Sequence, residues 1–368
     1  MSRDRAYIRD FRELRSGDRE LVGGKSASLG EMVAAGLPVP DGFAVTVDAF
    51  EAFRDTGDVR ARLRALVQGA DVGSASALAR AHEDAVAIVL GSPVPGDVEA
   101  EIRSGYADLC ARVAALRGGP ATDLPVAVRS SSVDEDGDAA SFAGQQESYL
   151  WVLGADEVVE RVRECWASLY TPQAIAYRHG MSPEEAAAAS RISVAVQIMA
   201  HAEVAGVTFT VSPRTGDRSV VAINASWGLG QSVVSGEVTP DEYWLSKIGP
   251  EVVSSTVADK AHEYVPAPEG RGVLLREVDD ERRRIPCLDE AAAIELAAIA
   301  VRVEQHYGHP VDVEWALERS AGGQRRVLLL QARPETNWKR RKEQEAAKPA
   351  SLGYLAGIVS QVAKGTAG

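Results

Sequence analysis

Apolar residues recur three and four positions apart in several stretches of the chain, and this spacing predicts amphipathic helices. The stripe within residues 25–35 predicts a helix that Gly36 ends. Residues 48–118 are rich in alanine and in charged residues and are also expected to be mainly helical. The same spacing predicts two later helices, over about 156–178 and 289–306.

Short apolar runs, many with β-branched residues and alternating polarity, predict strands between these helices. We expect strands at 125–129, 192–198, 206–211, 219–223, 311–317 and 326–331. Residues 38–47 are expected to form a turn that leads into a further strand. Helices that alternate with such strands favour an α+β or α/β fold with a mixed sheet.

Charge and composition exclude some classes of protein. The 368-residue chain has 40 Lys and Arg against 53 Asp and Glu, so its net charge is −13, which argues against coating nucleic acid or anionic membrane. No apolar run approaches the ~20 residues of a membrane helix, and the N-terminus lacks the apolar core of a signal peptide. The scattered cysteines indicate a reducing cytoplasm and no zinc site. These cysteines are Cys110, Cys165 and Cys287.

A glycine pair precedes the first predicted helix, in the segment VGGKSASLGEM at residues 22–32. Glycines allow close approach of the backbone to a ligand, and the N-terminus of a helix attracts phosphate. Lys25 would add a full positive charge. The alternative is a glycine turn with a solvated Lys25 and a capping serine. The segment is not a Walker A loop, because GxxxxGK[ST] is absent.

The segment 126–149 carries a second candidate phosphate site. Arg129 stands at the end of a predicted strand, where it would be placed rigidly for a bidentate phosphate contact. Small residues around Gly144 and Gln145 would let backbone N–H groups face phosphate oxygens in a flexible flap. A polar surface hairpin with an Arg–Asp pair is the alternative reading.

Two predicted strands form a candidate metal hairpin. If Leu317 lies opposite Arg326, Asp312 falls opposite Gln331 and Glu314 lies diagonal to it. Oxygen ligands at one spot suit Mg²⁺ that is shared with substrate phosphates. Arg333, on the same face as Gln331, could stabilise a phosphoryl group in transfer. The alternative is a salt-bridged hairpin face.

Two further stretches could surround a ligand. Residues 193–199 form an apolar strand with one polar residue, Gln197, which suits an adenine pocket or simply a core strand. Residues 224–241 form a glycine-spaced loop with Trp227, which could cap a ligand site or be a structural β-arch.

Together these stretches resemble the ATP-binding (ATP-grasp) domain of the phosphoenolpyruvate synthase family, which includes pyruvate phosphate dikinase, rifampicin phosphotransferase and phenylphosphate synthase. The resemblance covers about residues 5–336. Its motifs follow the family's order: VGGKSASLGEM, VAVRSSS, ASFAGQQESYL, VAVQIM, AGVTFTVSP, ASWGLGQSVVSGEVTPDEY, VEWAL and LLLQARPET.

The resemblance implies an α+β, two-lobed ATP-grasp fold with mixed or antiparallel sheets flanked by helices. We expect a mainly helical N-terminal lobe at 1–120, a C-terminal lobe at 121–336, and a linker or docking tail at 337–368. ATP and Mg²⁺ are the implied ligands. Their implied binding residues are Lys25, Arg129 and Arg333 for phosphate, Gly144 and Gln145 for the flap, Gln197, Ile198 and Met199 for adenine, and Glu314 and Gln331 for Mg²⁺. Lys25, Arg129 and Arg333 are also the implied catalytic residues.

In that family ATP phosphorylates a histidine on a swivelling domain, AMP and phosphate are formed, and the phosphohistidine then serves a small-molecule acceptor. None of the six histidines here has the glycine-rich context of that domain. The resemblance therefore implies a phosphotransferase subunit or domain whose histidine lies on a separate subunit or on further C-terminal domains. Two alternatives stay open: a stand-alone ATP-grasp kinase or ligase that acts directly on a small molecule, and a non-catalytic nucleotide-binding partner.

Overall fold

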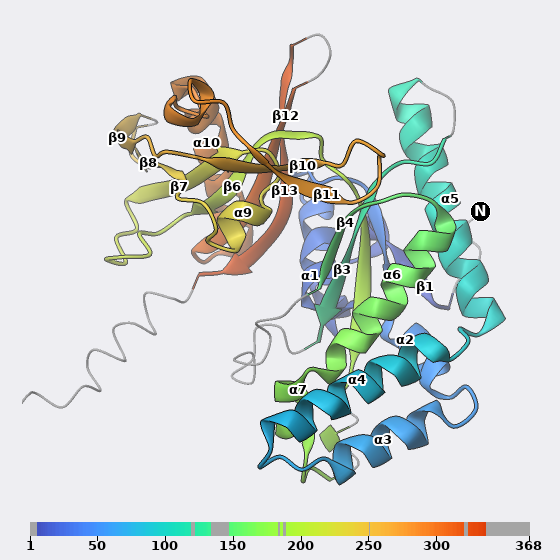
Figure 1. Ribbon diagram of the computed structural model, residues 1–368. Coiled ribbons are helices and arrows are strands. Elements are labelled where there is room, and N and C mark those ends of the chain that lie inside the picture. Colours follow the sequence, from blue (N-terminus) through green and yellow to red (C-terminus); the bar gives the residue numbers. More distant parts are fainter. Residues whose placement is uncertain are drawn as a thin grey trace, which may run out of the picture.

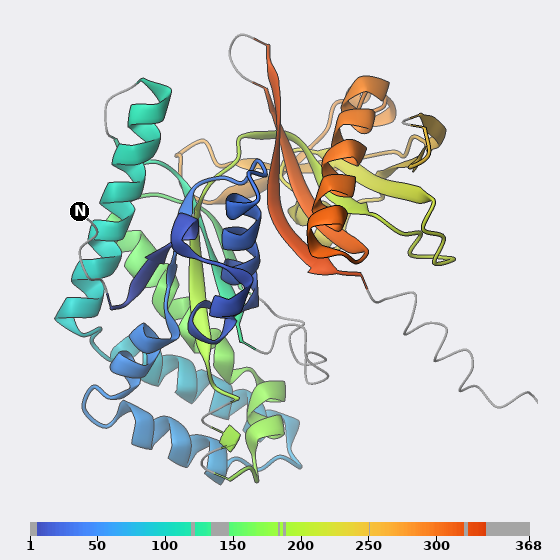
Figure 2. The same ribbon diagram turned by 180° about the vertical axis from the view of Figure 1, so that it is seen from behind.

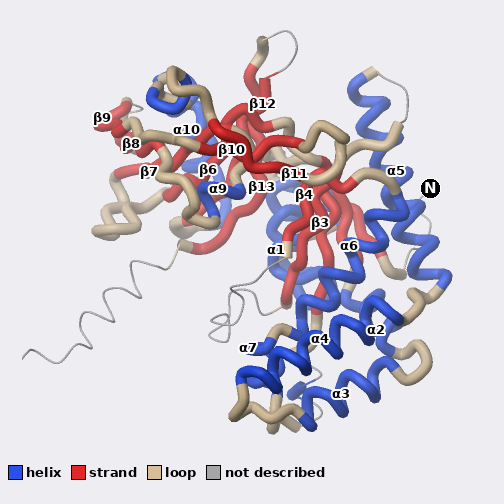
Figure 3. Tube along the Cα trace, in the orientation of Figure 1, coloured by secondary structure: helices blue, strands red, loops and turns tan. Residues whose placement is uncertain are grey.

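Helices and antiparallel sheets combine in an α+β fold with two lobes, as predicted (Figure 1). The computed structural model describes residues 6–118, 122–133, 147–182, 185–186, 189–249, 251–319 and 323–335. Figure 3 contrasts the first lobe, which is rich in helices, with the second, which is built mainly of strands. No helix among the described residues is long and apolar enough to cross a membrane.

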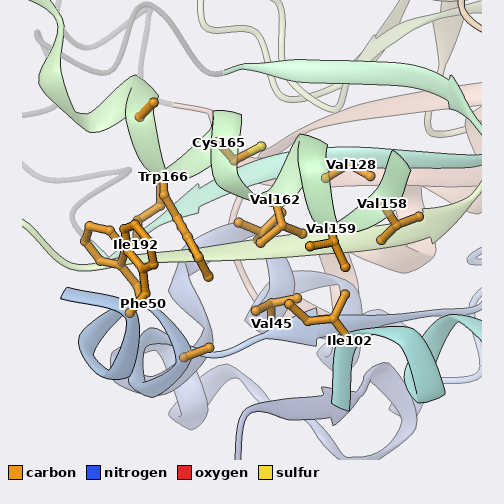
Figure 4. Packing of buried hydrophobic residues seen from close by; sticks show 14 of the residues in the cluster. Val45, Phe50, Ile102, Val128, Val158, Val159, Val162, Cys165, Trp166 and Ile192 are labelled. Atoms are coloured by element: carbon orange, nitrogen blue, oxygen red, sulfur yellow. The ribbon is translucent and has the colours of Figure 1, made fainter. Parts of the chain in front are cut away.

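The first lobe is a five-stranded antiparallel sheet with helices packed on one face. In spatial order its strands are β1 (Ile8–Asp10), β2 (Gly42–Val45), β5 (Ile192–Ile198), β3 (Val126–Ser132) and β4 (Ser148–Val152). Its helices are α2 (Val47–Arg54), α3 (Val59–Gly69), α4 (Ala75–Gly91), α5 (Gly96–Arg117), α6 (Ala155–Ala167) and α7 (Pro172–Arg178). Valines of the strands meet Trp166 and Phe50 of these helices in one apolar core (Figure 4).

The second lobe is a six-stranded antiparallel sheet with one long helix on one face. In spatial order its strands are β13 (Arg325–Pro334), β12 (Val311–Arg319), β6 (Ala202–Phe209), β7 (Val220–Trp227), β8 (Asp241–Ser246) and β9 (Val252–Thr256). The helix is α10 (Glu290–Tyr307), and the short helix α9 (Gln231–Val234) follows β7. A separate hairpin, β10 (His262–Pro266) and β11 (Val273–Glu277), reaches the first lobe, where Gly272 N donates to Trp151 O at 3.0 Å.

Helix α1 (Arg19–Ala34) lies between the two sheets, where it packs against β3 and β5 of the first and β13 of the second (Figure 2). Its residues Leu29 and Met32 are fully buried in a core that also takes Ala195 from the first sheet and Trp315 from the second. The first sheet offers small residues to α1 because its larger apolar side chains alternate onto the opposite face. The two lobes therefore share one hydrophobic core around α1.

Two sequence-based expectations differ from the structure. The helix expected over 156–178 is broken, since α6 ends at Ala167 and α7 starts at Pro172, whose ring cannot continue the preceding helix. The expected lobe boundary at residue 120 does not coincide with a boundary between sheets. Because β5 pairs with both β2 and β3, strands from both sides of residue 120 belong to the first sheet.

Candidate functional site

Lys25 is placed by a break inside helix α1. Gly23 has φ +71°, and a Cβ atom there would lie 2.2 Å from Ser131 O, so only glycine allows α1 to approach β3 this closely. The break directs Lys25 into the interior, where the residue is 2% exposed. Its Nζ donates to Ser130 O at 2.6 Å. A buried ammonium group is thereby held beside the end of β3.

Ser131 holds the same turn from the side of the strand. Its Oγ donates to Val22 O at 2.9 Å and accepts from Ser26 N at 3.2 Å. The glycine–lysine segment and the arginine–serine segment are more than a hundred residues apart in sequence and form one structural unit.

Arg129 reaches from β3 to the second sheet. Its Nη1 donates to Leu330 O at 3.0 Å, and its Nη2 donates to Gln331 Oε1 at 2.9 Å and to Glu314 Oε2 at 3.1 Å. The side chain is 13% exposed. Arg129 therefore joins the two lobes at the place where β12 and β13 carry their polar residues.

The register predicted for the β12–β13 hairpin is wrong by two residues. Glu314 lies directly opposite Gln331, and Asp312 lies opposite Arg333. One residue of the difference arises at the connecting turn, where Leu317 pairs with Val327, and the other at a β-bulge after Glu314. The result strengthens the predicted juxtaposition, because Glu314 and Gln331 are direct neighbours instead of diagonal ones.

Positive charge exceeds negative charge in this cluster. Arg333 Nη2 donates to Glu314 Oε1 at 3.0 Å, so the Glu314 carboxylate lies between two guanidinium groups. Lys25, Arg129 and Arg333 against Glu314 and Asp312, which lies opposite Arg333, leave an excess of one positive charge. Such a cluster is suited to a polyanion.

The oxygens of Glu314 and Gln331 converge on a single cationic nitrogen, Arg129 Nη2. The guanidinium group of Arg129 therefore occupies the place between these two oxygens where a metal cation could be held. Within the described ranges no group of three or more His, Cys, Asp or Glu residues is placed to hold a metal ion by itself. One carboxylate and one amide oxygen fit Mg²⁺, which commonly takes few protein ligands and completes its shell with water and substrate phosphates.

A pocket of about 160 Å³ opens at the edge of β13, between this strand and α1. Lys25, Gln331 and Arg333 line it on the side of the cluster. Its other lining residues include Arg19, Ser28 and Tyr307. The pocket therefore extends the cationic cluster toward the solvent.

An apolar patch of small side chains adjoins the charged cluster. Ala205, Ala316 and Leu328 are buried together, and Leu330, next to Gln331, packs on them. A neighbouring group of apolar residues comes from both lobes and from the β10–β11 hairpin. This group contains Ala127, Trp151, Met199 and Leu229, with Tyr264 and Val273 packed against them.

The residues predicted to contact adenine lie near this patch. Ile198 pairs with Val126, three residues from Arg129 along β3, which is about 10 Å of strand. The backbone N–H groups of Ile198 and Met199 donate to Asp41 O and Pro125 O, both at 2.9 Å. Gln197 is buried and donates from Nε2 to the carbonyl oxygen of residue 40 at 3.3 Å. The side chain of Gln197 is therefore not part of the charged cluster.

The predicted flap residues Gly144 and Gln145 lie outside the described residues, as does the tail 337–368. Sequence reasoning missed the role of Ser131 and the two carbonyl groups, of Ser130 and Leu330, that accept from Lys25 and Arg129. The run of serines after Arg129 was a visible signal, but its partners were not. Backbone acceptors leave no signal in a sequence.

The cysteines are not placed for nucleophilic chemistry. All three are free thiols, and burial raises the pKa of Cys165 and of Cys287 well above the usual range. Buried protonated thiols are poor nucleophiles.

Comparison with known proteins agrees with the motifs. The family model described as pyruvate phosphate dikinase, AMP/ATP-binding domain, matches residues 19–353. A probable phosphoenolpyruvate synthase of Staphylothermus marinus is 38% identical over 367 residues, which cover 94% of this chain and 43% of the relative.

Two further relatives show the same partial coverage. A probable phosphoenolpyruvate synthase of Methanocaldococcus jannaschii is 39% identical over 342 residues, which cover 93% of this chain and 28% of the relative. The phosphoenolpyruvate synthase of Escherichia coli is 37% identical over 340 residues, which cover 89% of this chain and 41% of the relative. The chain thus spans less than half the length of these relatives.

Proposed function

Because this chain belongs to the pyruvate phosphate dikinase AMP/ATP-binding domain family, we propose that it binds Mg·ATP between its two sheets and transfers a phosphoryl group to a histidine. That histidine would lie on a separate swivelling domain or partner protein. ATP and water would yield AMP, phosphate and the phosphohistidine, and the phosphohistidine would then serve a small-molecule acceptor. The observation that carries the proposal is the contact of Arg129 Nη2 with both Glu314 and Gln331, beside Lys25 and Arg333.

The triphosphate is the part of the nucleotide that suits the cationic cluster. Lys25 is rigid because it is buried, so it would fix one phosphate group without losing side-chain freedom on binding. Arg129 would exchange its carboxylate and amide partners for phosphate oxygens. Its guanidinium group offers the paired donors that phosphate accepts.

Glu314 and Gln331 would hold Mg²⁺ once Arg129 turns to the phosphates. The metal, when bound, would neutralise negative charge on the phosphate oxygens. Arg333, at 37% exposed the most accessible of the three cations, would face the phosphoryl group that leaves for the acceptor. Its guanidinium would stabilise charge that grows during transfer.

The purine ring would lie along the patch of Ala205, Ala316 and Leu330, toward Met199. Three residues of β3 separate that end from Arg129. An extended nucleotide could therefore reach from the Val126 end of β3 to Arg129 in the middle of the strand. The names of the relatives support a phosphoenolpyruvate-type enzyme as the context of this domain, and the identity of the acceptor belongs to the rest of such an enzyme.

The test uses ATP labelled separately at the β and γ phosphates. The pure chain is incubated with Mg²⁺ and this ATP, with and without the polypeptides encoded next to its gene, and AMP, ADP and acid-labile protein label are followed. We expect AMP and a labelled histidine only when such a partner is present. ADP formed by the chain alone, with a modified small molecule and no phosphohistidine, would instead establish a stand-alone kinase or ligase.

A further inference from the structure

Ser28 ties the helix that carries Lys25 to the strand that carries Gln331 and Arg333. It lies three residues after Lys25 on α1, which is close to one helical turn. Its Oγ donates to Ala332 O at 2.9 Å. Ala332 is the residue between Gln331 and Arg333, so this bond holds the backbone that presents both side chains against α1.

Tyr307 supports Ser28 from the last residue of α10. Its hydroxyl lies 3.3 Å from the backbone oxygen of Ser28, to which it donates, and 3.3 Å from Ser28 Oγ. Burial raises the pKa of Tyr307, so the phenol stays a protonated donor. Ser28 is thereby held from two sides, by a strand and by a second helix.

This link matters because β13 is the edge strand of its sheet. The outward carbonyl groups of an edge strand have no strand partner, and here they are bonded by the first lobe. Leu330 O accepts from Arg129 and Ala332 O accepts from Ser28. When Arg129 turns to a bound nucleotide, the Ser28 bond to Ala332 O still holds this part of β13 against α1, together with the backbone bond from Leu329 N to Pro38 O at 2.8 Å.

We propose that Ser28, supported by Tyr307, is a positioning residue that sets the separation of Lys25 from Gln331 and Arg333 and so matches the site to the β and γ phosphates of ATP. This inference rests on the proposed function. Both residues line the pocket beside the cluster, but neither needs to touch the nucleotide. Loss of the Ser28 hydroxyl should therefore weaken the binding of ATP more than that of AMP. AMP lacks the β and γ phosphates, whose binding depends on the separation of Lys25 from Gln331 and Arg333.

The experiment measures the Kd of Mg·ATP and of AMP by calorimetry for the wild type and for Ser28→Ala, Ser28→Thr and Tyr307→Phe. Loss of one hydrogen bond should weaken ATP binding of Ser28→Ala about fivefold or more, with AMP binding within about twofold of the wild type. Ser28→Thr keeps the hydroxyl, so the ratio of its Kd for ATP to its Kd for AMP should equal that of the wild type. Tyr307→Phe should also weaken ATP binding more than AMP binding, but by a smaller factor than Ser28→Ala.

Ser104→Ala is the matched control, because Ser104 Oγ donates to a backbone carbonyl within α5, away from the site. A Ser28→Ala variant in which the Kd values of ATP and AMP keep the wild-type ratio, whether or not both are raised, would overturn the positioning role. A wild-type chain that binds AMP but shows no Mg²⁺-dependent gain for ATP would overturn the proposed function, and the inference with it. A wild type with that gain and an unchanged Ser28→Ala would overturn the inference alone.

Discussion

Arg129 Nη2 lies 3.1 Å from Glu314 Oε2, although the two residues are 185 positions apart in the chain. In this arrangement the guanidinium occupies the position between Glu314 and Gln331 that we assign to a divalent cation. Nucleotide and metal would therefore enter together. The phosphates would take Arg129 away from the carboxylate, and the metal would replace its charge there. The predictions below follow from this exchange and from the framework that supports it.

Glu314→Gln should separate metal binding from nucleotide binding. The change removes one negative charge from between two arginines, so ATP without Mg²⁺ should bind at least as well as to the wild type. The gain in ATP affinity on adding Mg²⁺ should fall about tenfold or more. Calorimetry with and without a chelator measures both, with Glu242→Gln as a control away from the site. A Mg²⁺-dependent gain equal to the wild type would refute the assignment of Glu314 as a ligand.

Arg333→Ala should affect chemistry more than binding. If its charge acts on the transferring phosphoryl group, the phosphorylation rate should fall about a hundredfold, while the Kd of ATP changes much less. Single-turnover transfer from labelled ATP, with the partner present, gives the rate. Arg326→Ala, an exposed arginine on the same strand, should leave it unchanged. If Arg333→Ala lowers only the affinity for ATP and not the rate of phosphoryl transfer, Arg333 serves in nucleotide binding and not in transfer.

Gly23→Ala should disturb the break in α1 that places Lys25, for two reasons. Alanine disfavours the positive φ of this position, and its Cβ would clash with Ser131 O. Gly36 also has a positive φ, +68°, but a Cβ there meets nothing within 4 Å. Gly36→Ala should lower the free energy of unfolding by about 1–2 kcal/mol. Gly23→Ala should cost more, and it should also weaken ATP binding, because Ser131 must move. Urea unfolding and calorimetry of the two variants decide this, and equal costs would mean that the close approach to Ser131 is easily relaxed.

The buried pair of Lys260 and Asp241 should be essential to the second lobe. Both side chains are 0% exposed, and Lys260 Nζ lies 2.6 Å from Asp241 Oδ1. Lys260→Met leaves a buried carboxylate without its cation, which should cost about 3–5 kcal/mol of unfolding free energy. Arg62→Met, which breaks an exposed ion pair with Asp58, should cost less than about 1 kcal/mol. Similar costs for the two variants would contradict the burial of the Lys260 pair.

Glu31 should contribute stability that acid removes. A hydrogen bond from the backbone of Ser16, together with His306, holds the pKa of Glu31 below its ordinary value of 4.5. Because the pKa is lower in the folded state, this stabilisation is present above the unfolded pKa and is lost as pH falls through the folded pKa. Glu31→Gln should therefore flatten the fall in unfolding free energy below about pH 4.5. Unfolding at several pH values tests this, and a slope in Glu31→Gln equal to that of the wild type would contradict the contribution of Glu31.

Several features of this protein could be read from the sequence alone. The strand at 192–198 and the helix expected at 289–306 were predicted within a residue or two of β5 and α10, because hydrophobic periodicity acts over short distances along the chain. Lys25, Arg129, Glu314, Gln331 and Arg333 were predicted as site residues because each stands in a motif with its own chemistry. Their assembly into one cluster was implied by a family resemblance, and their individual motifs left alternatives open.

The tertiary structure decided what depends on contacts between distant segments. The register of β12 and β13 is set by a turn and a β-bulge, and neither could be located from residue spacing. The pairing of β5 with β2 and β3 placed strands from both sides of the expected boundary at residue 120 in the first sheet. Ser28 shows the same limit: its sequence neighbours indicate a helix near a phosphate site, but its partner Ala332 is 304 residues away. Local propensity cannot specify such a bond, because the bond exists only after the shared core around α1 has brought the two sheets together.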